Sequence, residues 1–213
     1  MAELRERLEK GLTALELSLL PGQLEQLLDY LALLVKWNRA YNLTAVRDPQ
    51  QMVTRHLLDS LAVLPHLGPG RMLDVGSGAG LPGIPTAIAE PQRPVVLLDS
   101  NGKKTRFLTQ AVAELGLENA SVVHSRLEQY RPDGLFDVVI SRAFASLADM
   151  LEGARHLIAP GGRFVAMKGA YPVAELDAVP EGFEILGVEA LEVPGLGAER
   201  HLVYARVAPP IEG

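Results

Sequence analysis

Residues 72–83 read MLDVGSGAGLPG, and this stretch decides the fold. Its apolar residues predict the end of a strand, and its alternating glycines predict a tight turn into a helix near Pro82. Because glycine has no Cβ, the backbone of such a turn can come close to a ligand. The first N–H groups of the helix have no partner within the helix and can face that ligand. The pattern is typical of a site for a nucleoside cofactor.

A second marker lies 25 residues after Asp74, where the apolar run 95–98 ends at Asp99. In a doubly wound sheet, an acid at this position stands at the carboxyl end of the strand beside the glycine turn. It can accept hydrogen bonds there from ribose hydroxyl groups. The two markers together, in this order, indicate a nucleoside site much more strongly than either one alone.

Beyond residue 70 the chain alternates between short strands and helices. Strands are predicted at 71–75, 95–98, 121–124, 136–140, 163–167, 183–188 and 201–207. Helices are predicted at 82–89, 103–115, 147–157 and 172–179, with a helical turn at 127–130 and a tight turn at 160–162. This alternation predicts an α/β fold with a parallel sheet covered on both faces. The last two strands have no long helix between them, so they are expected to form an antiparallel edge pair.

The first 66 residues show no strand pattern and are predicted to form a helical extension. Leucines recur at helical spacing between residues 24 and 34, and a further helix is expected from Pro49 to Leu64. A linker rich in proline and glycine, 65–70, marks the boundary. We therefore predict an extension at 1–66 on the substrate side and a cofactor-binding domain at 67–213. Trp37 fits either a core position or a substrate-facing surface.

Composition excludes several classes of site and protein. The 213 residues include no cysteine, which excludes disulfides, thiolate metal sites and methylation of pyrimidine C5 through a cysteine adduct. No metal is expected. The sequence contains no apolar run of membrane-spanning length and no apolar core of a signal peptide, so we expect a cytoplasmic protein without a membrane partner. The net charge of −6 argues against a sequence-blind nucleic-acid binder.

The glycine turn and Asp99 fit nicotinamide dinucleotides and S-adenosylmethionine alike, and three features favour the second cofactor. The glycines that follow the strand, at 76, 78 and 80, lack dinucleotide spacing, which occurs only in the later frame 78, 80, 83. Asp74 precedes the turn, where a carboxylate suits a sulfonium or ammonium group and repels a pyrophosphate. The final antiparallel pair fits the seven-stranded sheet of class I methyltransferases. We therefore predict a Rossmann-like class I methyltransferase, with a mostly parallel sheet and an antiparallel last strand.

Six segments occur in one order and together resemble a single family. They are KWNRAYNLT (36–44), RHLLDS (55–60), DVGSGAGLPG (74–83), LDS (98–100), SRAFA (141–145) and ERHL (199–202). From about Leu24 to Val207 the chain resembles the bacterial small-subunit rRNA methyltransferase G family, also called glucose-inhibited division protein B. The resemblance implies methylation of guanine N7 in 16S rRNA, in the loop near the decoding site, with S-adenosylmethionine as methyl donor.

The resemblance also implies which residues contact the cofactor. The family's contacts fall on Gly76, Leu81, Leu127, Glu128 and Arg142, and the ribose acid on Asp99. The glycine turn itself indicates two further contacts, Asp74 and Gly78. In one departure, Ala79 stands where many members have proline, which predicts a less stiff loop.

The implied chemistry needs positioning more than acid–base groups. Guanine N7 carries a free lone pair and no proton, so it can attack a sulfonium methyl group in line without a general base. Catalysis then consists of holding the two atoms about 3 Å apart and aligned. Arg142 can donate to the guanine edge or to the cofactor carboxylate, and both roles stay open. Phe144 fits base stacking or core packing, and Lys168 fits a pocket residue or an ordinary surface lysine.

Recognition of the RNA is expected to involve local basic residues on an acidic protein. The candidates for RNA contact are Arg39, Arg47, Arg55, His56, Lys103, Lys104, Arg106 and Arg200, together with Phe144. Because the net charge is negative, we predict weak binding to bare RNA and a substrate within a small ribosomal subunit or its precursor. The protein itself is expected to be a monomer.

Three other functions are compatible with parts of the sequence. A methyltransferase for small molecules or proteins would share the sheet, although an extension carrying Trp37, Tyr41 and Arg55 favours a large substrate. A non-catalytic ribosome-assembly factor would not need the intact glycines and Asp99. An oxidoreductase would need a hydride-transfer site, and none is evident in the sequence.

Overall fold

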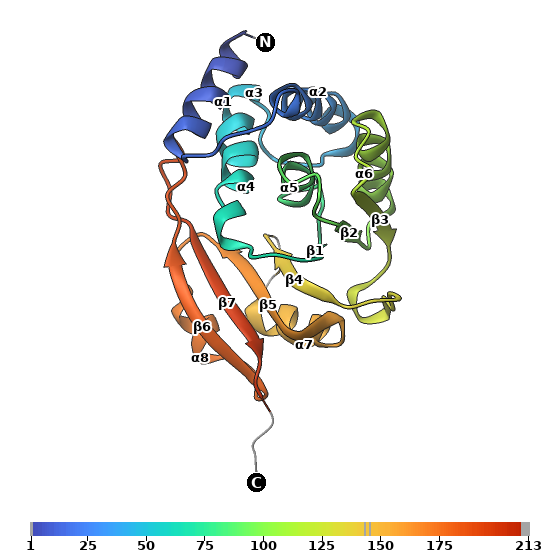
Figure 1. Ribbon diagram of the computed structural model, residues 1–213, viewed down its shortest axis with the longest axis vertical. Helices are drawn as coiled ribbons and strands as arrows, with labels where there is room; N and C mark the ends of the chain where they lie inside the picture. Colours follow the sequence, from blue (N-terminus) through green and yellow to red (C-terminus); the bar gives the residue numbers. More distant parts are fainter. Residues whose placement is uncertain (1, 143, 145, 210–213) are drawn as a thin grey trace.

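The computed structural model describes residues 2–142, 144 and 146–209. A seven-stranded sheet forms its centre, with strand order β3-β2-β1-β4-β5-β7-β6 (Figure 1). The strands are β1 (Met72–Val75), β2 (Val95–Asp99), β3 (Ala120–His124), β4 (Phe136–Ser141), β5 (Ile158–Lys168), β6 (Phe183–Ala190) and β7 (His201–Val207). The seven predicted strands are all present.

Strands β1 to β5 pair in parallel, whereas β7 runs antiparallel to both of its neighbours, β5 and β6. This arrangement confirms the predicted antiparallel last strand and the class I methyltransferase topology. Every residue of β1 and β2 is buried, as expected for parallel strands with both faces covered. The loops after these strands therefore leave the sheet at one shared carboxyl edge.

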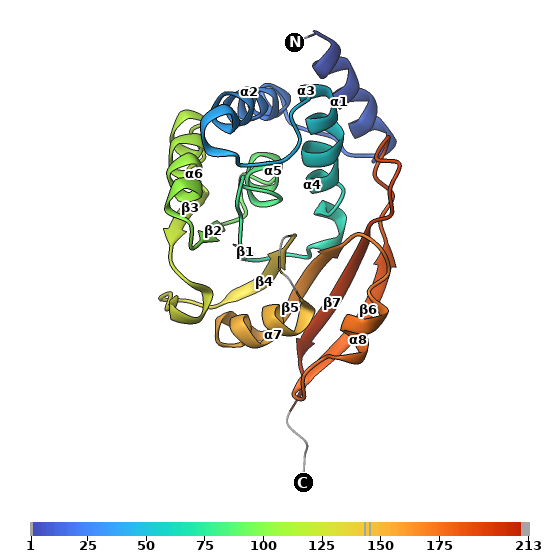
Figure 2. The same cartoon turned by 180° about the vertical axis from the view of Figure 1, so that it is seen from behind.

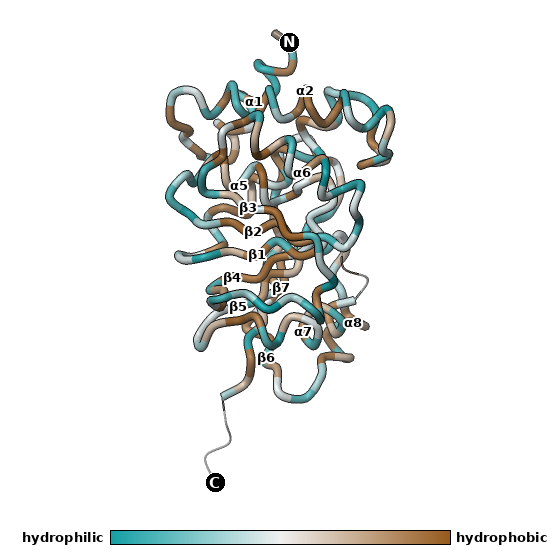
Figure 3. Tube along the Cα trace, turned by 90° about the vertical axis from the view of Figure 1, so that its right-hand side faces the viewer, coloured by the Kyte–Doolittle hydropathy of each residue, from teal (hydrophilic) through white to brown (hydrophobic). Residues whose placement is uncertain are grey.

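Helices cover the two faces of the sheet, and the hydropathy trace shows the apolar strands between them (Figure 3). On one face, α5 (Gly83–Ala89) and α6 (Gly102–Glu114) pack in a core cluster that includes Leu97 and Phe107. On the other face, α7 (Leu147–Ala154) packs against residues such as Phe164, and the short helix α8 (Val173–Asp177) lies beside it.

The N-terminal residues form a helical layer over α5 and α6. Its elements are α1 (Ala2–Ala14), α2 (Gln23–Tyr41), α3 (Pro49–Met52), the π-helical turn η1 (Val53–Leu58) and α4 (Asp59–Leu61). Both ribbon views place α1 and α2 at one end of the molecule and α8 at the other (Figures 1 and 2). The fully buried Tyr30 donates its hydroxyl to the carbonyl of Ala79 at 2.6 Å, which ties α2 to the glycine turn.

Two local expectations need adjustment. The predicted helix 49–64 is helical from 49 to 61, but its centre widens into η1. The predicted turn at 160–162 is wrong, because these residues lie within β5. Gly161 has φ of +79°, and the β4–β5 register shifts between Phe136 and Val138, so the glycines form an irregularity inside the strand. Trp37 packs against Phe107 at a ring distance of 5.8 Å, which favours its core role.

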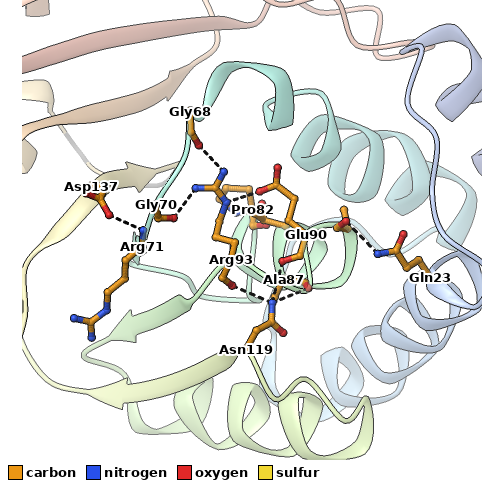
Figure 4. Close-up of polar contacts among 12 residues, drawn as sticks. Gln23, Gly68, Gly70, Arg71, Pro82, Ala87, Glu90, Arg93, Asn119 and Asp137 are labelled. Atoms are coloured by element: carbon orange, nitrogen blue, oxygen red, sulfur yellow. Dashed lines mark hydrogen bonds and ion pairs between the residues drawn. The ribbon is translucent and has the colours of Figure 1, made fainter.

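Polar contacts hold the segment before β1 and the end of α5 together (Figure 4). Arg93 donates to the carbonyls of Gly68 at 2.5 Å and Gly70 at 2.9 Å, and its guanidinium pairs with Glu90. The Asn119 side chain donates to the carbonyl of Ala87 at 3.0 Å. These contacts lie where β1 and β2 begin, so the opposite, carboxyl edge is the one available for a ligand.

Candidate active site

The glycine turn follows β1 directly. Gly76, Gly78 and Gly80 have φ values of +68°, +57° and +88°, a region that favours glycine. A Cβ on Gly80 would lie 2.5 Å from the buried Ile84 side chain, which would have to shift. A Cβ on Gly76 would meet no atom within 4 Å, so Gly76 borders open space.

Asp99, the last residue of β2, holds the turn in place. Its Oδ2 accepts a hydrogen bond from the N–H of Gly78 at 2.8 Å, and its Oδ1 accepts one from the N–H of Asn101 at 2.8 Å. The residue is 6% exposed, which leaves a small part of the carboxylate surface accessible. Because each oxygen has two lone pairs, the fixed carboxylate can still accept hydrogen bonds from ribose hydroxyls.

Asp74 is a fully buried carboxylate beneath the same turn. Its Oδ2 accepts the N–H of Gly83 at 2.9 Å, and its Oδ1 has no partner among the described residues. Burial raises the pKa of Asp74 to about 7, against the opposing effects of the Gly83 N–H, the Ser77 hydroxyl and the positive charge of Arg142. An unpartnered buried carboxylate oxygen fits a cationic ligand group.

Two adjoining hollows open beside the turn. One has a volume of about 730 Å³ and the other about 330 Å³, and both are lined by Gly76, Asp99, Glu128 and Phe144. Leu127 lines the smaller hollow and Lys104 the larger one. The structure therefore brings four predicted cofactor residues together: Gly76, Asp99, Leu127 and Glu128. Leu81, also predicted, is buried in the core and borders neither hollow.

Arg142 follows β4 and reaches toward the N-terminal layer. It donates to the carbonyl of Arg55 at 3.1 Å and to Oδ2 of Asp59 at 3.3 Å. Arg200 donates its Nε to the other oxygen of Asp59 at 2.6 Å. Sequence reasoning missed Asp59 as a site residue, although it lies in the RHLLDS segment that supports the family resemblance.

Two further predicted residues have structural partners. Lys168 pairs with Glu175 at 2.7 Å, and the same carboxylate accepts the N–H of Leu147, so the lysine joins β5 to α7 and α8. His56 is buried and contacts the Thr44 hydroxyl at 2.9 Å. Burial, with help from Arg142, lowers the pKa of His56 to about 4. The histidine is therefore neutral at pH 7, and its burial favours a structural role over the RNA contact that the sequence suggests.

The other basic candidates differ in their freedom to contact RNA. Arg39, Arg55, Lys103 and Arg106 are exposed. Arg47 is exposed too, but it donates to the Asn38 carbonyl at 2.9 Å and thus supports the loop after α2.

Among the described parts of the chain, no helix combines the length and apolar character needed to cross a bilayer.

The comparison with known proteins decides the family. The family described as rRNA small subunit methyltransferase G matches residues 23–203. The chain belongs to this family. Ribosomal RNA small subunit methyltransferase G of Chromobacterium violaceum is 56% identical over 197 residues, which cover 92% of this chain and 94% of the relative. The corresponding protein of Pseudomonas aeruginosa is 54% identical over 202 residues, with 94% of each chain covered.

Solved structures that resemble this member of the methyltransferase G family share its fold. A glycopeptide N-methyltransferase complexed with S-adenosylmethionine superposes with a TM-score of 0.61 at 14% identity, over 72% of this chain and 88% of that one. An S-adenosylmethionine-dependent methyltransferase from Aquifex aeolicus gives 0.57 at 21% identity, over 76% and 94%. Both comparisons support the class I methyltransferase architecture.

Proposed function

We propose that the protein transfers the methyl group of S-adenosylmethionine to N7 of a guanine in 16S rRNA, in the loop near the decoding site. The observation that carries the proposal is family membership across residues 23–203, with relatives aligned over nearly their full length. The geometry of the carboxyl edge agrees with this function. Phe144, which follows β4, lines both hollows beside the glycine turn.

The chain supplies partners for the ribose, the adenine and the ammonium group of the donor. Asp99 would accept the ribose hydroxyls, and the backbone at Gly76 and Gly78 would lie against the donor. Leu127 and Glu128, in the smaller hollow, would border the adenine. Asp74 lies buried beneath the same turn, and its unpartnered oxygen directs negative charge toward the donor ammonium group. Bound there, S-adenosylmethionine supplies an electrophilic methyl group on a sulfonium.

Transfer requires alignment rather than proton removal. Guanine N7 has a lone pair and no proton, so the new N–C bond forms as the C–S bond breaks, and no base is needed. The protein must hold the guanine within about 3 Å of the methyl group, in line with the breaking bond. Arg142, at the end of β4, and Phe144, at the hollow, are the residues we assign to orienting the base or the donor.

Loss of Arg142 is expected to abolish most methylation. In a strain that lacks the enzyme, wild-type protein should restore N7-methylguanine in 16S rRNA, whereas Arg142→Ala should reduce the initial rate about 100-fold or more. Mapping of N7-methylguanine in rRNA from both strains measures the restoration, and time courses of methyl transfer to small-subunit particles measure the initial rate. Arg206→Ala is the matched control, since Arg206 lies on β7 and pairs with Glu184 at 2.8 Å. Wild-type protein that binds the donor but leaves 16S rRNA unmethylated would refute the proposed reaction.

We further propose that the enzyme acts in the cytoplasm, as a monomer, on an assembled or nearly assembled small subunit. The net charge of −6 disfavours tight binding to bare RNA, and only a few exposed arginines and lysines are candidates for phosphate contacts. Purified particles should therefore be methylated much faster than protein-free 16S rRNA. Equal rates on both substrates would contradict this assignment.

Donor binding is expected to weaken as the pH falls through 7. Asp74 must be ionised to neutralise the donor ammonium, and burial raises its pKa to about 7, with Arg142 and Asp99 as the charged neighbours. The dissociation constant of S-adenosylmethionine should therefore rise about tenfold between pH 8 and pH 6. Calorimetric titrations at several pH values measure this change. Asp74→Asn should bind weakly at pH 8 and lose this pH dependence; an unchanged pH profile in that variant would exclude Asp74 as the group responsible.

The ionisation of Asp74 also changes the free energy of unfolding. A rise in pH strengthens donor binding but lowers stability. The fold raises the pKa of Asp74 from 3.8 to about 7, so between these values the donor-free native state binds more protons than the unfolded chain. This group therefore lowers the free energy of unfolding as the pH rises through that window. The contribution of Asp74 to the pH dependence should be absent in the Asn variant.

A further inference from the structure

Two large apolar side chains lie exposed close together in the loop after β5. Tyr171 is 52% exposed and Val173 is 60% exposed. The other exposed large apolar side chains of the described residues stand singly in the sequence; they are Leu20, Leu135 and Leu186. Single exposed apolar residues are normal on a protein surface, whereas neighbouring ones mark a place where a partner can bind.

This loop lies at the carboxyl edge of the sheet, to which we assign donor and substrate. Lys168 ends β5 and pairs with Glu175 of α8 at 2.7 Å. The same carboxylate accepts the N–H of Leu147, the first residue of α7, at 2.5 Å. Arg142 and Phe144 lie between β4 and α7. The loop after β5 is therefore tied to the segment that we assign to orienting the guanine or the donor.

The ring of Tyr171 is held in place by its neighbours. His201, the first residue of β7, contacts it with ring centroids 5.6 Å apart and ring planes at 85°. Nδ1 of His201 donates to the carbonyl of Gly169 at 2.7 Å, so the same imidazole also fixes the start of the loop. A perpendicular contact covers at most one face of a ring, so His201 leaves at least one face of Tyr171 open. A ring that is already fixed loses little conformational entropy when a ligand binds.

The chemistry of the loop fits a nucleobase better than a phosphate or a protein. The sequence contains no lysine, arginine or histidine between Ala170 and Glu199, so this stretch offers no cation to a phosphate. It offers an aromatic face, and the unstacked bases of RNA loops stack on such faces. A protein interface of ordinary size would need a much larger patch than two side chains.

We propose that Tyr171 is a stacking platform for an unpaired base that flanks the target guanine in the rRNA loop. The proposal rests on the proposed function and adds a residue that binds the plane of a base. Arg200, which the sequence predicts as an RNA contact, directly precedes His201, so the platform adjoins a candidate contact to the same RNA. Val173 adds apolar surface two residues further along the loop.

The first test replaces Tyr171 in the full-length protein by alanine, leucine and phenylalanine. The loss of stacking on one base should raise the KM for small-subunit particles about tenfold or more in Tyr171→Ala, with little change in kcat. Tyr171→Leu should show the same increase, because an apolar side chain without a ring cannot stack. Tyr171→Phe keeps the aromatic face and should retain the wild-type KM. Leu186→Ala is the matched control, since it removes a side chain of 47% exposure from β6 and should leave KM unchanged.

Two further measurements separate stacking from other roles of the loop. The ring carries no charge, so the plot of log KM against log salt concentration should have the same slope in Tyr171→Ala and in the wild type. The dissociation constant of S-adenosylmethionine, measured by calorimetry, should also stay unchanged. A less steep salt plot would overturn the proposal and assign the loop to a phosphate. A loss of donor affinity would overturn it too, because Tyr171 would then support the donor site.

The three substitutions also identify the alternatives. An unchanged KM in Tyr171→Ala would refute the platform. A wild-type KM in Tyr171→Leu would overturn the proposal and indicate an apolar contact with a ribosomal protein. An equal loss in Tyr171→Phe would overturn it as well, because the hydroxyl group would then be the part that binds. Failure of the proposed function would look different, since the wild-type protein would then leave the particles unmethylated.

Discussion

Replacing Asp99 by alanine is expected to weaken the binding of S-adenosylmethionine at least about 100-fold, because two hydrogen bonds from ribose hydroxyls to a charged carboxylate contribute about 1.5–3 kcal/mol each. The change also removes the acceptor for the N–H groups of Gly78 and Asn101, which Asp99 holds at 2.8 Å. The glycine turn then loses its fixed position relative to β2. Isothermal titration of the donor into purified protein measures the loss.

Asp137→Ala is the matched control for this experiment. Asp137 also accepts a backbone N–H, that of Arg71, at 2.7 Å, but it lies near the start of β4, at the opposite edge of the sheet. Its replacement should lower stability and leave donor affinity unchanged. A folded Asp99→Ala protein that binds the donor as tightly as the wild type would show that the donor lies elsewhere.

The parts of the site that depend on local sequence pattern could be predicted. The glycine turn and Asp99 lie at the ends of neighbouring strands, and the observed register pairs Asp74 with Leu97 and Val75 with Leu98. This adjacency follows because the loops after parallel strands all leave a doubly wound sheet at its carboxyl edge. The fold class followed from the same alternation of strands and helices.

The cluster around Asp59 could not be predicted in this way. Asp59, Arg142 and Arg200 lie in three segments whose contact depends on how the N-terminal layer docks and on the direction of β7. In the sequence, Asp59 is an ordinary polar residue of an amphipathic helix. No periodicity distinguishes such a residue from a carboxylate buried between two arginines.

Turn propensity and residue type predict the wrong environment at two other places. The segment 160–162 has the composition of a turn, yet it lies within β5, because a glycine of positive φ serves a strand irregularity as well as a turn. His56 adjoins Arg55 and by residue type belongs with the basic residues. Its burial beside Thr44 lowers its pKa, and burial depends on tertiary packing that the sequence does not display.

Gly76→Ala is expected to abolish donor binding while changing the fold little. Gly76 has φ of +68°, and an added Cβ would meet no protein atom within 4 Å. The methyl group would instead project into the hollow that we assign to the donor, which Gly76 lines. A displacement of the donor by about 1 Å is enough to cost about 100-fold in rate, and overlap with the new Cβ should weaken affinity by a similar factor or more.

Gly116→Ala separates this effect from backbone strain. Gly116 follows α6, has φ of +63°, and also offers open space to a Cβ. Both variants place an alanine in the left-handed region, so each should lose about 1–2 kcal/mol of stability. Only Gly76→Ala should also lose donor affinity. At a donor concentration 100 times the wild-type dissociation constant, the wild type and Gly116→Ala should each gain about 2.7 kcal/mol of stability. Gly76→Ala should gain almost none. Equal gains in the two variants, read from urea unfolding with and without donor, would mean that the donor does not approach the backbone at Gly76.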